Sequence, residues 1–263
     1  MTQPSEDPDG LRTVVATRYV APLREGGSLP GLMEADDLGT YVVKYRGAGQ
    51  GPRVLVAEVV VAGIAEAIGL ATPRQVAVDL TRALTRYEAD EEVQDLLRAS
   101  VGLNLGVDFL PGAFGYDGQA SAEPDVAARV LWLDALCANV DRSWRNPNLL
   151  WWHRRLWVID HGAALYFHHS WPGGVGDPAR FAAQRWDAGD HLLASSAGRA
   201  RELDEELGAA LTDEVLEAVL ARVPDAWLDP VPGAEDPAAL RAAYVAFLRA
   251  RLGTRQWLPG GDA

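Results

Sequence analysis

The pattern of apolar and polar positions predicts that β-strands dominate the start of the chain. β-Branched and aromatic residues concentrate at 11–21 and again at 39–45, and a glycine-rich stretch at 26–31 separates the two runs. Runs of this length, bounded by glycines and prolines, are typical of strands joined by turns. The sequence therefore begins with strand, loop and strand.

A long apolar segment comes next. It opens at Pro52, continues almost without interruption to Ile68 and stops at Gly69. Proline at the first helical position and glycine just past the last one are boundary signals of a helix. We therefore expect a buried helix here. Pro73 then introduces a short strand at 75–80, which gives the order β-β-α-β.

The remainder is predicted to be mainly helical, with one hairpin. Residues 91–101 are amphipathic and 124–139 are apolar almost all round, which indicates one surface helix and one buried helix. Two apolar runs on either side of a polar centre predict a β-hairpin between 148 and 160. Later helices are expected at 212–223 and 236–252.

The composition is that of an ordinary globular protein and limits its partners. The chain has 263 residues, of which 48% are hydrophobic and 23% charged, and its formal net charge is -13. This acidic balance opposes binding to a phosphate backbone, so we expect no direct contact with nucleic acid. No apolar stretch reaches the roughly 20 residues of a membrane-spanning helix. A membrane partner is therefore not expected.

Two features indicate the compartment. Residues 1–9 are polar and acidic, which predicts a disordered tail and differs from the basic, apolar start of a signal peptide. Cys137 is the single cysteine and cannot form an internal disulfide, which suits a reducing environment. We therefore expect a cytoplasmic protein.

Three polar residues around the predicted hairpin indicate phosphoryl-transfer chemistry. Asp141 and Asn146 lie in one loop, and Asp160 follows the hairpin with Gly162 close behind, where the chain is expected to turn away. A hairpin returns both of its ends to the same edge, so Asp141 and Asp160 should lie near each other. We predict Asp141 as the catalytic base, with Asn146 and Asp160 as oxygen ligands of Mg²⁺. Alone, an Asp-Arg pair in a loop is more often a surface ion pair.

Two further residues complete the set that such a site needs. Lys44 is the only lysine and ends the second predicted strand, where its ammonium group suits nucleotide phosphates, although a solvated strand end is the alternative. Glu58 is an isolated charge in the predicted buried helix, and Lys44 is its natural partner; Glu66 is the rival, nearer the solvated helix end. The glycine-rich loop is either a phosphate contact or a plain turn, and its candidate residues are Gly26, Gly27 and Ser28.

A second interpretation places a metal-dependent hydrolase at the same position. His161, His168 and His169 follow the hairpin and could bind a metal together with Asp160. Adjacent histidines on a strand would point to opposite faces, which favours packing or substrate-loop roles for this pair. A bound zinc ion would distinguish the two interpretations.

Taken together, these residues resemble the HipA-like kinases, which are distant relatives of protein and phosphatidylinositol kinases. The resemblance extends over about residues 10–190. The segments that carry it are 41–51, 57–58, 67–73, 139–142 with Asn146, and 159–162.

The resemblance implies an α+β, bilobal protein-kinase-like fold with ATP and Mg²⁺ in the cleft. A small β-rich N-lobe would comprise residues 10–82, and a mostly helical C-lobe would comprise residues 83–263. The roles of Asp141, Asn146, Asp160, Lys44 and Glu58 would be those given above. The strand at 76–80 would lead into the hinge, where the backbone meets adenine, and the residues concerned are Asp79 and Leu80.

The predicted function is ATP- and Mg²⁺-dependent transfer of a γ-phosphate to a hydroxyl group, on a serine or threonine of a protein. One alternative is a kinase of a small molecule or a lipid head group, which shares the ATP-side residues and differs in the acceptor pocket. We expect residues 163–190 to shape that pocket. The other alternative is a pseudokinase that binds nucleotide without turnover. The expected partner is thus a protein or small-molecule phosphoacceptor.

Overall fold

The computed structural model describes residues 10–23, 29–86, 90–118 and 122–260 of an α+β protein. The chain forms two compact units. The first consists of Met1–Val56, Pro73–Pro111 and Arg222–Leu228, and the second of Ala57–Thr72, Gly112–Ala221 and Asp229–Ala263. The predicted tail at 1–9 lies outside the described residues.

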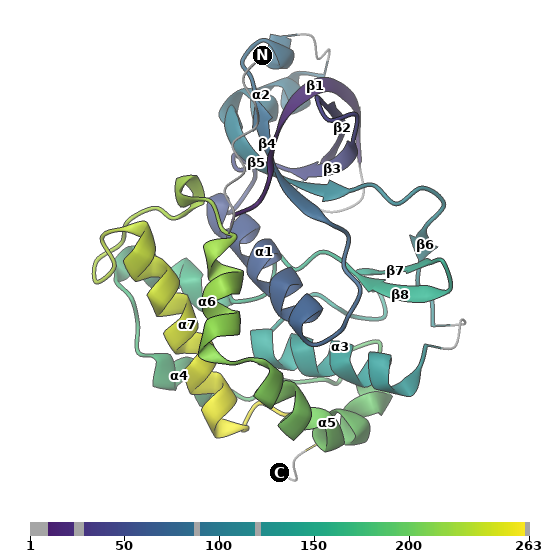
Figure 1. Cartoon of the computed structure of the whole chain (residues 1–263), viewed down its shortest axis with the longest axis vertical. Helices are drawn as coiled ribbons and strands as arrows, with labels where there is room; N and C mark the ends of the chain where they lie inside the picture. The colour runs from purple at the N-terminus through teal and green to yellow at the C-terminus, as the bar shows by residue number, and fades with distance from the viewer. Residues whose placement is uncertain (1–9, 24–28, 87–89, 119–121, 261–263) are drawn as a thin grey trace. The chain divides into compact units, whose positions relative to one another are not determined.

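The first unit contains a closed five-stranded barrel (Figure 1). Around the barrel the strands follow the order β1 (Thr13–Pro22), β2 (Gly31–Ala35), β3 (Thr40–Lys44), β5 (Gly102–Asp108) and β4 (Gln75–Leu80). Strand β1 closes the barrel by pairing with β4 in parallel, and the other pairs are antiparallel. The barrel therefore has no free edge.

The barrel interior follows from the alternation of side chains along its strands. Met33 on β2 and Val43 on β3 are 0% exposed, while their sequence neighbours are only partly buried. Gly106 on β5 lets the backbone approach β4 closely, because a Cβ atom there would lie 2.5 Å from Val78 and 2.9 Å from Val76. The missing side chain at Gly106 leaves room for Val76 and Val78, so β4 and β5 pack closely inside the barrel.

The barrel differs from the prediction in two strands. The strands at 11–21, 39–45 and 75–80 are confirmed, but β2 and β5 were not predicted. Strand β5 contains only one β-branched residue, Val107, and is held by its pairing with β3 and β4. Its Asn104 is buried, with Oδ1 accepting from the Arg46 amide at 2.9 Å. Residues 83–111 belong to the first unit. The sequence analysis had instead placed them in the C-lobe, with the boundary at 82.

Helices make up most of the second unit. Helix α1 (Pro52–Ala67) starts in the first unit and continues in the second, and α3 (Pro124–Cys137) is buried on nearly all sides. Both helices were predicted. The surface helix predicted at 91–101 is α2 (Glu91–Ala99) of the first unit, and the helices predicted at 212–223 and 236–252 are α6 (Asp213–Ala221) and α7 (Pro237–Thr254). Two helices were not predicted, α4 (Pro178–Ala182) and α5 (Ala197–Ala210).

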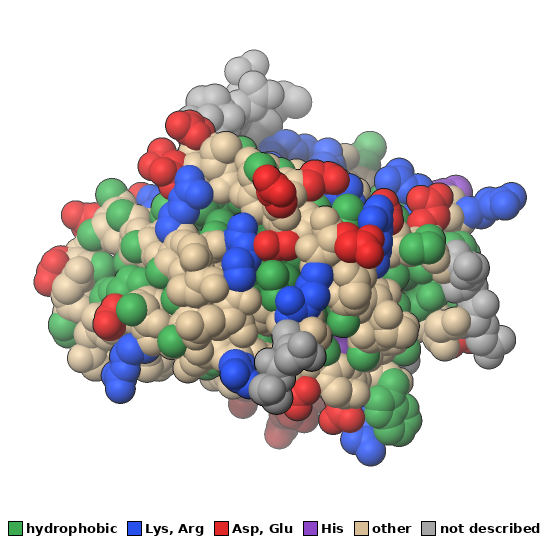
Figure 2. Space-filling view, turned by 90° about the horizontal axis from the view of Figure 1, so that it is seen from below, with side chains coloured by type: hydrophobic (Ala, Val, Ile, Leu, Met, Phe, Trp, Pro, Cys, Tyr) green, Lys and Arg blue, Asp and Glu red, His purple; other side chains and the backbone are tan. Residues whose placement is uncertain are grey.

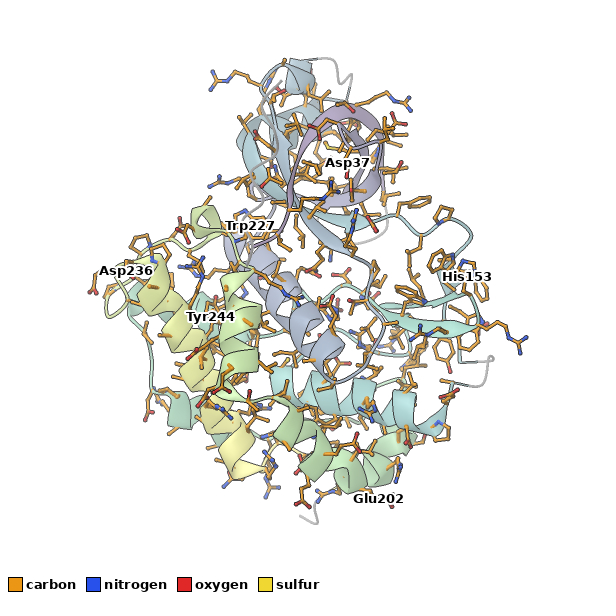
Figure 3. The ribbon with its side chains drawn as sticks, viewed as in Figure 1. Asp37, His153, Glu202, Trp227, Asp236 and Tyr244 are labelled. Carbon is orange, nitrogen blue, oxygen red and sulfur yellow. The ribbon has the colours of Figure 1, made fainter. Side chains whose placement is uncertain are left out.

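The predicted hairpin is confirmed as β7 (Leu149–Trp152) and β8 (Arg155–Val158), which β6 (Phe114–Gly115) extends to three strands. His153 and Arg154 form its turn with φ values of 48° and 61°. Two central residues with positive φ are the mark of the tight turn that matches the twist of a hairpin. Figure 3 labels His153 at this tip. The turn fixes the register that pairs Leu149 with Val158.

One buried cation anchors α7 to the helix that precedes the candidate site. Arg251 on α7 is 0% exposed and donates to the carbonyl of Ala135 on α3 at 2.8 Å. It also donates to the carbonyls of Phe181 at 2.8 Å and Gln184 at 3.0 Å. Burial lowers the pKa of Arg251 to about 10. The Arg251 guanidinium thus links α7 to α3 and to residues 181 and 184 through hydrogen bonds to their carbonyl oxygens.

Side chains of both charges and apolar side chains share the surface. On the face drawn in Figure 2, arginine side chains lie among acidic ones. None of the helices in the described ranges has both the length and the apolar character that a bilayer crossing requires.

Candidate active site

The predicted base and the first predicted metal ligand lie together in the loop after α3. Ala138 ends that helix in the left-handed conformation, with φ 52°, and the loop continues to Asn148. Asp141 Oδ2 accepts hydrogen bonds from Asn146 Nδ2 at 2.9 Å and from Asn148 Nδ2 at 3.2 Å. Two amides therefore orient one carboxylate, and each amide keeps its own oxygen for another ligand.

Hydrogen bonds within the loop also stabilise its conformation. Asn139 Oδ1 accepts from the Asp141 amide at 3.1 Å. Ser143 Oγ accepts from the amides of Arg145 and Asn146, both at 3.3 Å, and the Ser143 amide donates to the Asn146 carbonyl at 3.0 Å. These short-range bonds fix the loop around Asp141.

The hairpin brings Asp160 back to this loop, as predicted. The Asn148 carbonyl accepts from the Ile159 amide at 3.2 Å, and Asp160 is the next residue. Asn148 thus contacts Asp141 with its side chain and the strand before Asp160 with its backbone. The turn itself differs from the expectation at Gly162, because the left-handed conformation falls on Asp160, with φ 56°. Aspartate tolerates this region better than most residues.

Glu58 reaches the same turn from α1. It is only 2% exposed, and its Oε1 accepts from the His161 amide at 3.0 Å. Glu66 is exposed, as expected, and accepts from Thr72 Oγ1 at 3.0 Å. Lys44 belongs to the first unit and Glu58 to the second, so the ion pair between them stays a prediction.

The other residues assigned to the nucleotide lie in or near the barrel. Lys44 is half-buried at the end of β3, where it pairs with Leu105. At the end of β4, Asp79 pairs with Leu103 and Leu80 with Gly102. The glycine-rich candidates lie outside the described residues: Gly26, Gly27 and Ser28.

Arg142 has a structural role that the sequence did not reveal. Its side chain is 0% exposed and Nε donates to Asp134 Oδ2 at 2.6 Å. Nη1 donates to the carbonyl of Asn148 and, at 3.4 Å, to that of Ile159. Arg142 is therefore not a surface ion pair. It ties the loop of Asp141 to both ends of the hairpin.

Asp134 is the second residue that the sequence analysis missed. Burial by itself would raise the pKa of Asp134, but the Arg142 guanidinium and a hydrogen bond with His191 lower it to about 2. Asn139 Nδ2 donates to its other oxygen at 2.8 Å. The signal was present, because Asp134 is an isolated acid in an apolar helix, the same pattern that identified Glu58.

A cavity of about 250 Å³ lies beside the loop within the second unit. Its walls come from residues on both sides of Asp141, from Tyr166 and from residues 185–191. Two apolar side chains close to Asp141 are exposed, Val140 at 71% and Trp144 at 60%.

The histidines do not form the alternative metal site. His168 and His169 lie in a 3₁₀ helix, Tyr166–Gly173, so the strand assumed for them is wrong, and their Nε2 atoms are 3.2 Å apart. Within the described ranges, no three His, Cys, Asp or Glu side chains are grouped to hold a metal. The Asp160 carboxylate and the side-chain oxygen of Asn146 are hard oxygen donors, the kind that suits a magnesium ion beside phosphates.

The α+β fold, with carboxylate and amide oxygens together in the loop after α3, fits the kinase-like class of proteins. The chain belongs to the HipA-like kinase family. Residues 17–253 match the sequence pattern of that family. Kinases of this kind are phosphotransferases that use ATP and usually a divalent metal.

Two solved structures are similar to the chain at low identity. The crystal structure of the Helicobacter pylori proinflammatory kinase CtkA matches 89% of this chain and 95% of that one, with 12% identity and a TM-score of 0.49. That of the Golgi casein kinase matches 94% of this chain and 74% of that one, with 11% identity and a TM-score of 0.43. No curated protein matches the sequence.

Proposed function

We propose that this protein is a bilobal, cytoplasmic kinase that transfers the γ-phosphate of ATP, with Mg²⁺, to a serine or threonine hydroxyl of a protein. The observation that carries the proposal is the orientation of Asp141 by two amides, next to the turn that carries Asp160. Such an arrangement supplies a fixed proton acceptor beside oxygen ligands for a metal.

Each residue of the site has a role in this proposal. Asp141 accepts the proton of the acceptor hydroxyl on Oδ1, because Asn146 and Asn148 both donate to Oδ2. Asp160 and the side-chain oxygen of Asn146 would hold Mg²⁺, which neutralises phosphate charge when bound. Glu58 fixes the backbone beside Asp160 through the His161 amide.

On the nucleotide side, Lys44 would contact the phosphates and pair with Glu58. The backbone at the end of β4 would meet adenine, and the glycine-rich loop would cover the phosphates. The residues with these roles are Asp79, Leu80, Gly26, Gly27 and Ser28.

The exposed side chains around Asp141 favour a protein acceptor over a small molecule. Val140 and Trp144 expose large apolar surfaces within three positions of the base. Exposed apolar groups at a functional site are typical of a surface that a partner covers. A small acceptor in the 250 Å³ cavity would cover Val140, which lines it, but would leave Trp144 exposed, because Trp144 is not part of the cavity wall.

The test is phosphate transfer by the purified chain from γ-labelled ATP with Mg²⁺, to itself and to a mixture of proteins. Asp141→Asn should lower transfer at least ~10²-fold, because a general base is lost. Asp229→Asn is the control, since Asp229 is exposed and distant in sequence from the loop.

Three outcomes would contradict the proposal. Equal transfer by Asp141→Asn would show that Asp141 is not the base. Transfer to small hydroxyl compounds alone would show a small-molecule kinase. A rise in thermal stability with ATP, without any transfer, would show a pseudokinase.

A further inference from the structure

One buried carboxylate holds the catalytic loop on both sides of Asp141. Asp134 is 0% exposed; its Oδ1 accepts from Asn139 Nδ2 at 2.8 Å and its Oδ2 from Arg142 Nε at 2.6 Å. Asn139 in turn accepts from the Asp141 amide, at 3.1 Å. Asp134 touches neither the acceptor nor the phosphates in the proposed site, so any effect on transfer acts through position.

His191 is the remaining donor to this carboxylate, and its contacts define its tautomer. His191 Nδ1 accepts from the Leu193 amide at 3.0 Å, so Nδ1 carries no proton. Nε2 therefore carries the hydrogen and donates it to Asp134 Oδ2 at 3.0 Å. The Asp134 carboxylate thus accepts hydrogen bonds from Asn139, Arg142 and His191. The first two donors lie in the loop, and His191 lies beside it, so the three bonds form one network around Asp141.

The segment that carries His191 also lies against the loop at other points. Trp186 Nε1 donates to the Asn139 carbonyl at 2.8 Å, and the Trp144 amide donates to the Asp190 carbonyl at 3.3 Å. Ser143 and His191 form an isolated antiparallel bridge. The same segment lines the cavity beside Asp141. His191 thus links the wall of this cavity to the carboxylate that holds the loop.

We propose that Asp134 and His191 are positioning residues for Asp141, and that His191 couples the segment 185–191 to the geometry of the base. This inference rests on the proposed function only where it concerns transfer. A misplacement of a reacting group by ~1 Å can lower a rate by about 10²-fold, so the loss of one directing hydrogen bond should be measurable.

The experiment compares three variants that differ in one buried hydrogen bond. His191→Phe removes the donor to Asp134, whereas His191→Gln can present an amide N–H near the position of Nε2. Tyr244→Phe is the matched control, because the Tyr244 hydroxyl of α7 bonds to His168 Nδ1 at 2.9 Å, and neither residue belongs to the loop 138–148 or to the segment 185–191. Figure 3 labels Tyr244 on that helix.

The first measurement is transfer of γ-phosphate under steady-state conditions. His191→Phe should lower kcat about 10-fold while the KM for ATP stays within about twofold, and His191→Gln should recover most of the loss. Tyr244→Phe should lower the melting temperature by a similar amount with an unchanged kcat. Equal kcat values for His191→Phe and the unmodified chain would overturn the proposal, as would equal losses in His191→Phe and Tyr244→Phe.

The second measurement is amide hydrogen exchange over residues 139–148, which does not depend on activity. Exchange should accelerate there in His191→Phe and remain unchanged in Tyr244→Phe. Faster exchange in a chain that transfers no phosphate would refute the proposed function and retain the positioning role. Unchanged exchange would refute the positioning role whatever the activity. If His191→Phe does not fold, His191→Ala serves instead, because it leaves room for water beside Asp134.

Discussion

Arg142 donates to Asp134 over 2.6 Å, and neither side chain is exposed to solvent. A charge buried in this way is costly unless it is paired and hydrogen-bonded. Here the carboxylate has an arginine, a histidine and an asparagine as donors, and the guanidinium also reaches two carbonyls of the hairpin. The loop of Asp141 is thus built around a satisfied ion pair.

The stability of the protein should depend on acid through Asp134. Its pKa is about 2 in the folded chain, against roughly 3.9 when unfolded, so the unfolded state takes up the proton first. This contribution is fully present above about pH 4 and is lost as the pH falls toward about 2. A pKa change of this size corresponds to a contribution on the order of a few kcal/mol. Urea unfolding across this pH range should show the loss in the unmodified chain and a flatter profile in Asp134→Asn. Parallel profiles would show that another group is responsible.

Asp160→Asn should separate the charge of Asp160 from its backbone conformation. Asparagine also accepts the left-handed region, so the turn with φ 56° can persist. Without the carboxylate, we expect the Mg²⁺ concentration for half-maximal transfer to rise at least ~10-fold, because hard cations prefer charged oxygens. A Mg²⁺ titration of transfer measures this. Asp160→Ala is the comparison, since it should also lower the free energy of unfolding by roughly 1 kcal/mol. An unaltered Mg²⁺ dependence in Asp160→Asn would exclude Asp160 as a ligand.

The two asparagines that bind Asp141 should differ in their response to metal. Asn146→Ala removes a proposed Mg²⁺ ligand and should raise the Mg²⁺ requirement together with a fall in kcat. Asn148→Gly removes only an orienting amide, and glycine tolerates the φ of 48° at this position. It should lower kcat with the Mg²⁺ requirement unchanged. The same Mg²⁺ titration compares the two, and an identical response would mean that both bind metal or neither does.

The elements that the sequence predicted are those with a strong local signal. Strand β4 occupies the predicted residues, and the hairpin follows from two apolar runs around a polar centre. Strand β5 has no such signal, because its stability comes from partners that lie 22 to 67 residues away in the chain, from Leu80 opposite Gly102 to Tyr41 opposite Asp108. Local patterns cannot reveal pairing that only the closed barrel creates.

The residues of the candidate site also fall into two groups, those that local sequence predicts and those that only the folded chain brings together. Asp141, Asn146 and Asp160 could be predicted as neighbours because one loop and the hairpin that follows it determine their proximity. The support behind them was missed, because His191 lies 57 positions from Asp134 and joins it only in the folded chain. The role of Arg142 was hidden for a related reason, since its eight-residue separation from Asp134 spans a helix end. Buried charge in an apolar helix was the available clue.

The predicted ion pair between Lys44 and Glu58 is best tested by a double-mutant cycle. Lys44→Met removes the ammonium group, and Glu58→Gln removes the charge while its amide oxygen can still accept from the His161 amide. If the two side chains act as a pair, each single change should lower transfer strongly, and the double change should lower it little further. The expected coupling is on the order of 1–3 kcal/mol, as measured for residues in contact.

A parallel cycle with Glu66→Gln provides the control, because Glu66 is exposed and accepts from Thr72. If the effects of Lys44 and Glu58 are additive and Lys44 is instead coupled to Glu66, then the partner of Lys44 is Glu66, near the end of α1. Additivity in both cycles would leave Lys44 as a phosphate contact that no glutamate of this helix orients. Glu58 would then act through the turn of Asp160 alone, and its loss should raise the Mg²⁺ requirement while the KM for ATP stays constant.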